Sequence, residues 1–117
     1  MQFEFYESVT GDIPFADFLE KIPKKDALKL IRLIRIIQKI GLTVAIKQKY
    51  VKKLDKNLYE IRSRQGSTIQ RGLYFHVANE KYIITHGFTK KTQKTPSNEI
   101  AKAKRIRWIY FNRGDHQ

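Results

Sequence analysis

Hydrophobic side chains recur at helical spacing in the first third of the chain. They lie at positions i, i+3, i+4 and i+7 between residues 13 and 22, and again between residues 24 and 40, which is the period of one face of an α-helix. Asp12 is a suitable N-cap for the first segment, Pro23 ends it, and Gly41 stands where a C-cap glycine would end the second. The pattern therefore predicts a helical hairpin. Its inward residues are Phe15, Phe18, Leu19 and Ile22 in the first helix, and Ala27, Leu30, Ile31, Ile34 and Ile37 in the second.

From residue 50 the chain changes to short runs rich in β-branched and aromatic residues, separated by three or four turn-forming residues. Such runs are typical of strands, and such short separators favour antiparallel hairpins between consecutive strands. A weaker alternation over Phe3–Glu7 predicts a further strand near the N-terminus. The strands expected in the meander are 50–54, 58–64, 68–77 and 82–89.

A third helix is expected after the last strand. Thr95 is a suitable N-cap and Pro96 suits the first turn, so the helix should run to about Phe111. With 117 residues and no repeat or low-complexity linker, the chain is expected to form a single domain over residues 1–117. The inward residues of the third helix would be Ile100, Ala103, Ile106, Ile109 and Tyr110.

The chain is strongly basic, with 24 Lys and Arg against 11 Asp and Glu and a formal net charge of +13. Such a charge attracts nucleic acid, an anionic membrane surface or an acidic protein, and does not by itself distinguish between them. The longest apolar stretch, residues 28–42, is interrupted by cations, so no membrane span and no membrane partner are expected. The N-terminus lacks the pattern of a secretory signal, and a cytoplasmic location is expected.

The absence of cysteine excludes disulfides, thiol nucleophiles and Cys-based zinc sites. The sequence has no His, Asp and Glu grouping at metal-ligand spacing, and no phosphate-binding loop or dinucleotide motif. We therefore expect a protein that uses no metal and no cofactor.

The second predicted helix carries cations on a face away from its inward stripe, at residues 25, 29, 32 and 39. These form either a solvated outer face or a stripe that docks a partner. Additional apolar residues widen the helix surface beyond one stripe, so the helix either packs on two sides or binds a partner there. The candidate partner-binding residues are Leu28, Arg32, Leu33 and Ile36.

Cations also converge from consecutive strands. Alternation places Glu60, Arg62 and Arg64 on one face of their strand, and the next strand contributes Arg71, whose facing alternation leaves open. Cations that gather closely repel one another unless an anion relieves them, which favours a site for a phosphate-bearing ligand. The alternative without a ligand is a structural, cross-strand ion pair of Glu60 with either arginine. Further lysines that could hold phosphates are Lys52, Lys53, Lys90, Lys91 and Lys94.

Two ring side chains of the last strand have alternative interpretations. His86 is either a packed, hydrogen-bonded side chain or a general base. Phe88 is either a core residue or an exposed platform for a nucleobase.

Three segments stand out together: Leu-Tyr-Glu-Ile-Arg at 58–62, Arg-Gly-Leu-Tyr-Phe at 71–75, and His-Gly-Phe-Thr-Lys-Lys-Thr-Gln-Lys-Thr-Pro at 86–96. With the helical hairpin and residues 99–104, they resemble the RelE/HigB superfamily of bacterial toxins, in particular its phage-related HigB-like branch. The resemblance covers nearly the whole chain. It implies an α+β, RelE-like fold with an N-terminal strand, a helical hairpin and a C-terminal helix, in which the helices pack on one face of a small twisted antiparallel sheet.

The resemblance implies the toxin of a type II toxin–antitoxin system, acting as a ribosome-dependent mRNA interferase. In such endoribonucleases the 2′-hydroxyl of the message attacks the adjacent phosphate without a metal, leaving a 2′,3′-cyclic phosphate and a 5′-hydroxyl. The protein then has to supply only positioning, proton transfer and charge stabilisation. The implied partners are mRNA on the ribosome and a cognate antitoxin, HigA-like with a helix-turn-helix, in a hetero-oligomer.

The resemblance also implies roles for individual residues. Arg62 and Arg71 match the strand arginines of the family and would bind the scissile phosphate. Lys90 or Lys91 would protonate or stabilise the leaving oxygen. Glu60 is the candidate general base, with His86 as the substitute.

The chain departs from the family pattern at Gly72, where a bulky apolar residue is expected. A glycine there predicts a weakened strand or a bulge. Some relatives stack a late tyrosine or histidine on the mRNA base, for which Tyr110, Phe111 and His116 are the candidates. Two non-catalytic alternatives remain: an RNA- or DNA-binding module, and an inactive toxin relative that binds a protein partner.

Overall fold

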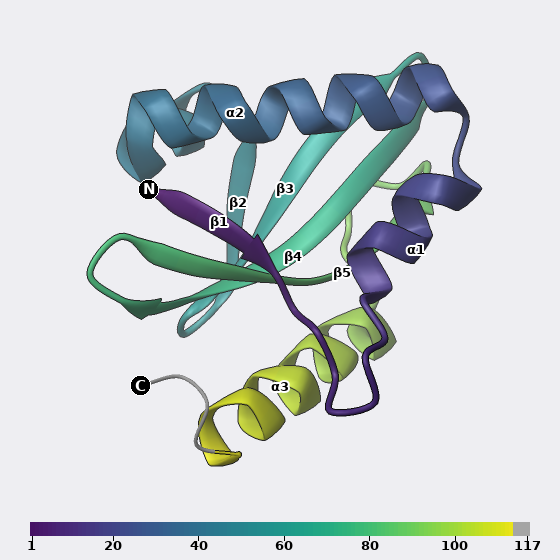
Figure 1. Ribbon diagram of the computed structural model, residues 1–117. Coiled ribbons are helices and arrows are strands. Elements are labelled where there is room, and N and C mark those ends of the chain that lie inside the picture. Colours follow the sequence, from purple (N-terminus) through teal and green to yellow (C-terminus); the bar gives the residue numbers. More distant parts are fainter. Residues whose placement is uncertain (114–117) are drawn as a thin grey trace.

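The computed structural model describes residues 1–113 as a five-stranded sheet with helices on both sides (Figure 1). Strands β2 to β5 form the predicted antiparallel meander, and β1 pairs with β5 in parallel, which gives the order β1-β5-β4-β3-β2. The α+β fold is confirmed, with a mixed rather than wholly antiparallel sheet. The elements are β1 (Gln2–Phe5), α1 (Pro14–Lys21), α2 (Lys24–Lys47), β2 (Val51–Asp55), β3 (Leu58–Gln65), β4 (Thr68–Ala78), β5 (Lys81–Lys90) and α3 (Ser97–Asn112).

The helices cover both faces of the sheet rather than one. α1 and α2 lie on one face and α3 on the other (Figure 1). Along β4, Tyr74 is buried in the core cluster with residues of α1 and α2, whereas its neighbours Leu73 and Phe75 are buried with residues of α3. Because successive strand residues point to opposite faces, β4 has an apolar core on each side. The expectation that the helices pack on a single face is therefore wrong.

α2 extends beyond its predicted end. Gly41 has φ +83°, which L side chains rarely adopt, and interrupts the helix where the sequence predicted its end. Helical turns then resume over residues 42–47 and bring Ala45 into the core. The break is thus confirmed, but the last turns were missed.

The predicted cap of the first helix is wrong. Ile13 occupies the N-cap position of α1 and makes no side-chain capping bond. Asp12 instead accepts a hydrogen bond of 3.1 Å from the hydroxyl of Thr10 in the preceding turn. Pro14 begins the helix, as the sequence suggested.

Gly72 and Gly87 are cross-strand partners that let α1 lie directly on the sheet. A Cβ at Gly72 would stand 3.0 Å from the Phe15 ring, and one at Gly87 only 2.3 Å from the Phe18 ring. The register is regular at Gly72, and the irregularity of the β4–β5 pair comes after Leu73. The expected bulge or weak strand at Gly72 is therefore not found, and the glycine is needed for close packing.

The described helices offer no segment that is long and apolar enough to cross a bilayer.

Candidate functional site

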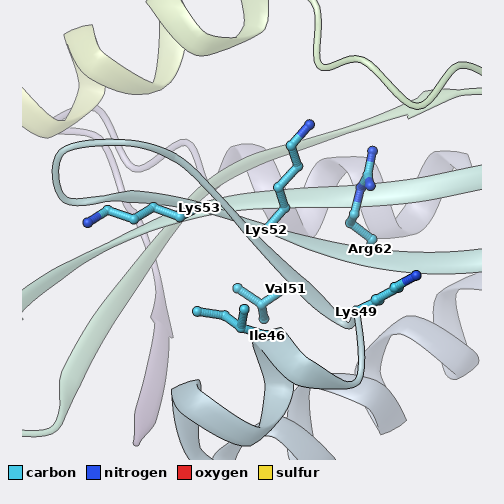
Figure 2. Close-up of a pocket in the computed structure, with 6 residues that line it drawn as sticks. All are labelled: Ile46, Lys49, Val51, Lys52, Lys53 and Arg62. Carbon is cyan, nitrogen blue, oxygen red and sulfur yellow. The ribbon is translucent and has the colours of Figure 1, made fainter.

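The register of the sheet brings the predicted cations together in neighbouring cross-strand rows. Arg62 on β3 lies opposite Arg71 on β4, which in turn lies opposite Phe88 on β5. Glu60 occupies the adjacent row, opposite Lys52 of the edge strand β2. Alternation places all five on the sheet face that α3 covers, and Lys52 and Arg62 project to the same side (Figure 2). The facing of Arg71, which the sequence left open, is thereby decided.

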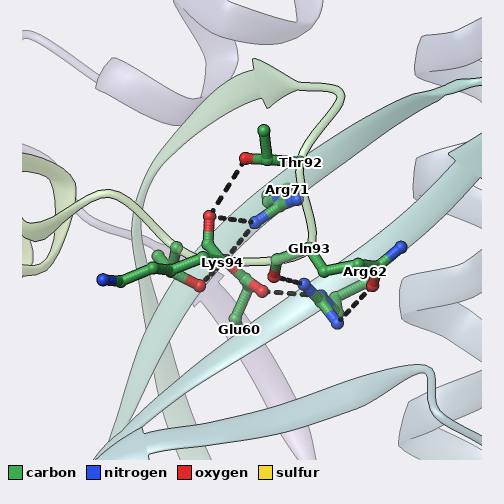
Figure 3. A network of polar contacts seen from close by, with 7 residues as sticks. Glu60, Arg62, Arg71, Thr92, Gln93 and Lys94 are labelled. Atoms are coloured by element: carbon green, nitrogen blue, oxygen red, sulfur yellow. Dashed lines mark hydrogen bonds and ion pairs between the residues drawn. The ribbon is translucent and has the colours of Figure 1, made fainter.

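Glu60 lies between the two arginines and contacts both (Figure 3). Its Oε1 is 2.8 Å from Nε of Arg62, and its Oε2 is 3.5 Å from Nη1 of Arg71. The Arg62 N–H is not aligned with the carboxylate, so this close contact is an ion pair rather than a good hydrogen bond. The side chains of Glu60 and Arg71 are fully buried, whereas that of Arg62 is 16% exposed. We call Glu60, Arg62 and Arg71 the arginine cluster.

The segment 91–96, which joins β5 to α3, crosses the arginine cluster. The backbone carbonyl of Gln93 accepts a hydrogen bond from Nη2 of Arg62, and the carbonyl of Lys94 accepts one of 3.5 Å from Nη1 of Arg71 (Figure 3). Carbonyl oxygens carry partial negative charge. They therefore occupy positions that the oxygens of a bound anion could take on the two guanidinium groups.

Thr95 serves the arginine cluster instead of capping α3. Its buried hydroxyl donates a hydrogen bond of 2.8 Å to Oε2 of Glu60. Pro96 occupies the N-cap position, and α3 begins at Ser97 without a side-chain cap. The predicted capping role of Thr95 is therefore wrong, and the residue supports the buried carboxylate.

Arg71 has unused hydrogen-bonding capacity. Its Nε and Nη2 atoms are buried and have no partner among the described residues. Burial lowers the pKa of Arg71 below its usual value, Glu60 opposes this change, and the positive charge of Arg62 adds to it. An arginine still keeps its proton near neutral pH because the guanidinium group is a very strong base. The cluster thus combines two cations and one carboxylate with buried donors that have no acceptor.

Exposed cations surround the arginine cluster. Arg64 and Lys90 lie on either side of Ile69 in one cross-strand row. Lys91 and Lys94 belong to the segment 91–96 that crosses the cluster. Lys53 points away from Lys52 and Arg62 (Figure 2). Within residues 1–113 no carboxylate is paired with the exposed cations predicted to hold phosphates. These are Lys52, Lys53, Arg64, Lys90, Lys91 and Lys94.

His86 lies outside the arginine cluster, because Leu73 separates it from Glu60 in the same cross-strand row. Its Nδ1 is 2.9 Å from the hydroxyl of Thr85, and its Nε2 is 3.0 Å from Oε1 of Glu99 at the start of α3. Burial lowers the pKa of His86, and the hydrogen bond to Glu99 opposes that change. His86 is thus packed and has a partner at each ring nitrogen.

Phe88 is a core residue in this structure. It is 7% exposed and packs with Leu58, Leu73 and Ala103. The guanidinium of Arg71 lies 5.8 Å from its ring centre, which adds a cation–π contact. The ring is not presented to solvent as a stacking platform.

The candidate partner-binding residues of α2 divide into two groups. Leu28 and Ile36 are 51% and 39% exposed, and Arg32 is exposed beside them. Leu33 packs against the core instead. A cavity of about 420 Å³ lies at the outer surface, lined by Lys25, Leu28, Lys29, Arg32 and Gln65.

The late aromatic candidates do not reach the arginine cluster. Tyr110 is buried and Phe111 packs in the same core cluster, under α3. His116 lies outside the described residues.

Within residues 1–113, no three His, Asp or Glu side chains are grouped so that they could hold a metal ion.

Sequence reasoning missed the contributions of the segment 91–96 and of the end of α2. Gln93 accepts hydrogen bonds from Arg62 at its side-chain Oε1 and at its backbone carbonyl, and a backbone carbonyl leaves no sequence signal. Ile46 and Lys49 line a cavity beside Arg62 that exists only because helical turns continue after Gly41. Thr95 could have been recognised as a site residue from its position between the last lysine and α3. A capping role was the simpler interpretation.

Comparison with protein families shows that residues 17–108 match the family described as phage-derived protein Gp49-like (DUF891). The match extends from α1 to α3 and includes the whole arginine cluster. No curated protein matches the sequence.

Proposed function

The chain belongs to the Gp49-like family of phage-derived proteins, a RelE-like, toxin-associated family, and from that premise we propose that it is a toxin that cleaves mRNA on the ribosome. Its place would be in the HigB-like branch, and its reaction a metal-independent transesterification. The observation that carries this proposal is the arginine cluster, with its excess of positive charge and its buried donors that have no acceptor.

In this reaction the 2′-hydroxyl oxygen of one nucleotide attacks the neighbouring phosphorus as its proton leaves to a base. The bond to the 5′-oxygen of the next nucleotide breaks, and that oxygen takes up a proton. The products are a 2′,3′-cyclic phosphate and a 5′-hydroxyl, so no oxidant, reductant or water is consumed. The transition state carries extra negative charge on the phosphoryl oxygens, which arginines stabilise with paired, directional hydrogen bonds.

Arg62 is the first phosphate ligand in this proposal because it is the partly exposed member of the cluster. Arg71 is buried beneath the 91–96 segment and becomes accessible when that segment is displaced. Phosphate oxygens would then replace the carbonyls of Gln93 and Lys94 on the two guanidinium groups. The exchange is favourable in kind, since a charged acceptor binds a guanidinium more strongly than a neutral carbonyl does.

Glu60 would accept the 2′-hydroxyl proton in the opened site. An ion pair with Arg71 and a hydrogen bond from Thr95 hold its Oε2 side in place. Lys90 or Lys91, both exposed at the end of β5, would donate to the leaving 5′-oxygen. His86 is assigned no proton transfer, because both ring nitrogens already have partners.

In the toxin–antitoxin complex, the antitoxin would bind the exposed part of the α2 surface. Its chemistry should be acidic or amphipathic, to match the net charge of +13 and the exposed Leu28 and Ile36. Charge would speed the encounter, and the apolar contacts would supply most of the lasting affinity. A HigA-like partner in a hetero-oligomer fits this description.

One observation favours a second candidate function. Glu60 and Arg71 are both fully buried, which suits a protein that binds RNA or a protein partner through its surface cations without breaking a bond. In that case the arginine cluster would be a structural ion pair.

The deciding experiment adds purified protein to a reconstituted translation system that contains one message. Primer extension should give discrete ends on the translated message, with 2′,3′-cyclic phosphate on the upstream fragment. Cutting should survive chelation of free divalent ions when ribosomes are stabilised by polyamines. Cleavage of naked RNA at the same rate would reject the role of the ribosome, and RNA binding without any cleavage would select the second candidate.

A further inference from the structure

A second hollow opens beside the arginine cluster, on the outer edge of β2 (Figure 2). Its volume is about 270 Å³. We call it the β2-edge pocket. It is lined by Ile46, Lys49, Val51, Lys52, Lys53 and Arg62.

The lining combines an apolar surface with a cationic rim. Ile46 is 41% exposed although it is a large aliphatic residue, and it lies next to the buried Val51. The other four lining residues are cations, and within residues 1–113 no carboxylate lines the pocket. The three lysines repel one another and Arg62, whose carboxylate partner Glu60 is shared with Arg71, and an anion in the pocket would relieve that repulsion.

The end of α2 creates this pocket. The helical turns after Gly41 carry Ile46 to the β2 edge, and the chain then turns at Lys49, which has φ +64°. Such a backbone conformation is strained for a residue with a side chain and recurs at functional positions. The turn is held by a hydrogen bond of 3.0 Å from the Tyr50 N–H to the Ala45 carbonyl.

The pocket is continuous with the arginine cluster through Arg62, which belongs to both. Lys52 stands opposite Glu60 and projects to the same side as Arg62. β2 is an edge strand, so its outer backbone groups have no strand partner. An extended chain lying on Arg62 would therefore meet the pocket next.

We propose that the β2-edge pocket is a nucleotide subsite for single-stranded RNA adjoining the phosphate bound at Arg62. A base lies on Ile46 and Val51, and the flanking phosphate lies against Lys49 and Lys52. The position of the RNA relative to Arg62 rests on the proposed function, whereas binding of RNA in the pocket does not. The pocket is smaller than the roughly 300–1,000 Å³ of drug-sized ligand sites, which suits one base and its sugar.

The test measures binding of a non-cleavable probe, a fluorescently labelled 2′-O-methyl hexanucleotide of mixed sequence, by anisotropy over a series of salt concentrations. Ile46→Glu places a negative charge on the floor of the pocket and should weaken binding about tenfold. Lys49→Asn keeps a residue that tolerates positive φ. Loss of one phosphate contact should reduce the slope of log affinity against log salt by about 0.7.

Each variant has a matched control on the same helical segment. Val44→Glu introduces the same charge at a residue that is 41% exposed and does not line the pocket. Lys47→Asn removes the same charge at a neighbouring exposed lysine that does not line the pocket. Both controls should bind the probe within about twofold of the parent protein at equal salt, and thermal melting should show that all four variants are folded.

The outcomes separate this inference from the proposed function. Pocket-dependent probe binding by a protein that never cuts message would support the subsite and reject the nuclease. Cleavage with unchanged positions and unchanged probe affinity in Ile46→Glu and Lys49→Asn would overturn the subsite and leave the nuclease standing. Loss of antitoxin binding in Ile46→Glu, with RNA binding intact, would also overturn it, because the pocket would then belong to a protein partner.

Discussion

Two groups of buried polar side chains lie on the same face of the sheet and differ in how completely they are hydrogen-bonded. His86 has a partner at each ring nitrogen, Thr85 on one side and Glu99 on the other. The arginine cluster has two cations for one carboxylate, and among residues 1–113 Nε and Nη2 of Arg71 have no partner. Buried polar groups without partners are costly and rare in folded proteins. The hydrogen bonds of His86 tie it to the fold, whereas the unsatisfied donors of the arginine cluster support our proposal that it binds a ligand.

The largest expected effect is on catalysis at Arg62. Arg62→Ala should reduce cleavage of translated mRNA by ~10²-fold or more, since it removes a donor to charge that develops in the transition state. Arg62 is partly exposed, so the variant should remain folded. The matched control is Arg35→Ala, an exposed arginine of α2, which should cut at the parental rate. Cleavage at the parental rate by a folded Arg62→Ala protein would reject the catalytic role proposed for the arginine cluster.

The second prediction concerns the stability of the arginine cluster. Glu60→Gln leaves two arginines without their counter-ion and should lower the free energy of unfolding by about 3 kcal/mol, at the low end for a broken buried pair because Arg62 reaches solvent. Urea denaturation monitored by circular dichroism measures the change.

A double variant sharpens this prediction. Glu60→Leu combined with Arg71→Met replaces the buried pair by apolar side chains and should recover most of the lost stability. It should nevertheless fail to cleave RNA. A stable and fully active double variant would show that the ion pair is not needed for the reaction.

A smaller loss of stability is expected at Thr95. Thr95→Val removes the hydroxyl that donates to buried Glu60 while keeping the shape of the side chain, and should cost about 1–2 kcal/mol of unfolding free energy. Thr92→Val, in the same segment but exposed, is the control and should change stability by less than about 0.5 kcal/mol. Equal effects of the two variants would mean that the hydrogen bond from Thr95 to Glu60 does not stabilise the fold.

The smallest effect is a pH dependence that belongs to His86. Burial depresses its pKa in the folded protein, so protonation favours the unfolded chain. The neutral form contributes its stability above the unfolded pKa of ~6.5, and that contribution declines as the pH falls below this value towards the folded pKa. Melting temperatures between pH 7.5 and pH 5 should therefore fall less steeply for His86→Gln than for the parent protein.

The control for that measurement is His76→Gln, at a partly exposed histidine near the far end of β4. It shows how far a histidine-to-glutamine change elsewhere in the sheet alters the melting temperature by itself. A His86→Gln variant that folds normally but loses cleavage would overturn the assignment of this histidine to the fold.

Much of the site could be predicted from local pattern. The alternation in residues 58–64 correctly placed Glu60 and Arg62 on one face, and the short separators correctly predicted the β2–β5 meander that sets Arg62 opposite Arg71. These features depend on neighbours a few residues apart, and strand geometry converts them directly into positions. Resemblance to a toxin superfamily added the order of the motifs, and the Gp49-like match agrees with it at the level of a toxin-like family.

Other features depended on contacts between distant segments. The sequence did not predict that Thr95 would bond to Glu60, 35 positions away, because a threonine before a proline fits a helix cap equally well. Nor did it predict that α3 would cover the face opposite α2, or that Gly72 serves the approach of Phe15 rather than a bulge.

The sequence by itself determined the strands, the helical hairpin, the charge and the identity of the cations that converge on one sheet face. Tertiary structure alone decided which of those cations are buried, which are exposed and which have no partner. The physical reason is that a secondary element follows from the period of its own side chains, whereas burial and hydrogen bonding depend on what another segment places against it. The carbonyls of Gln93 and Lys94 over the two arginines belong to that second kind, since every residue carries the same carbonyl.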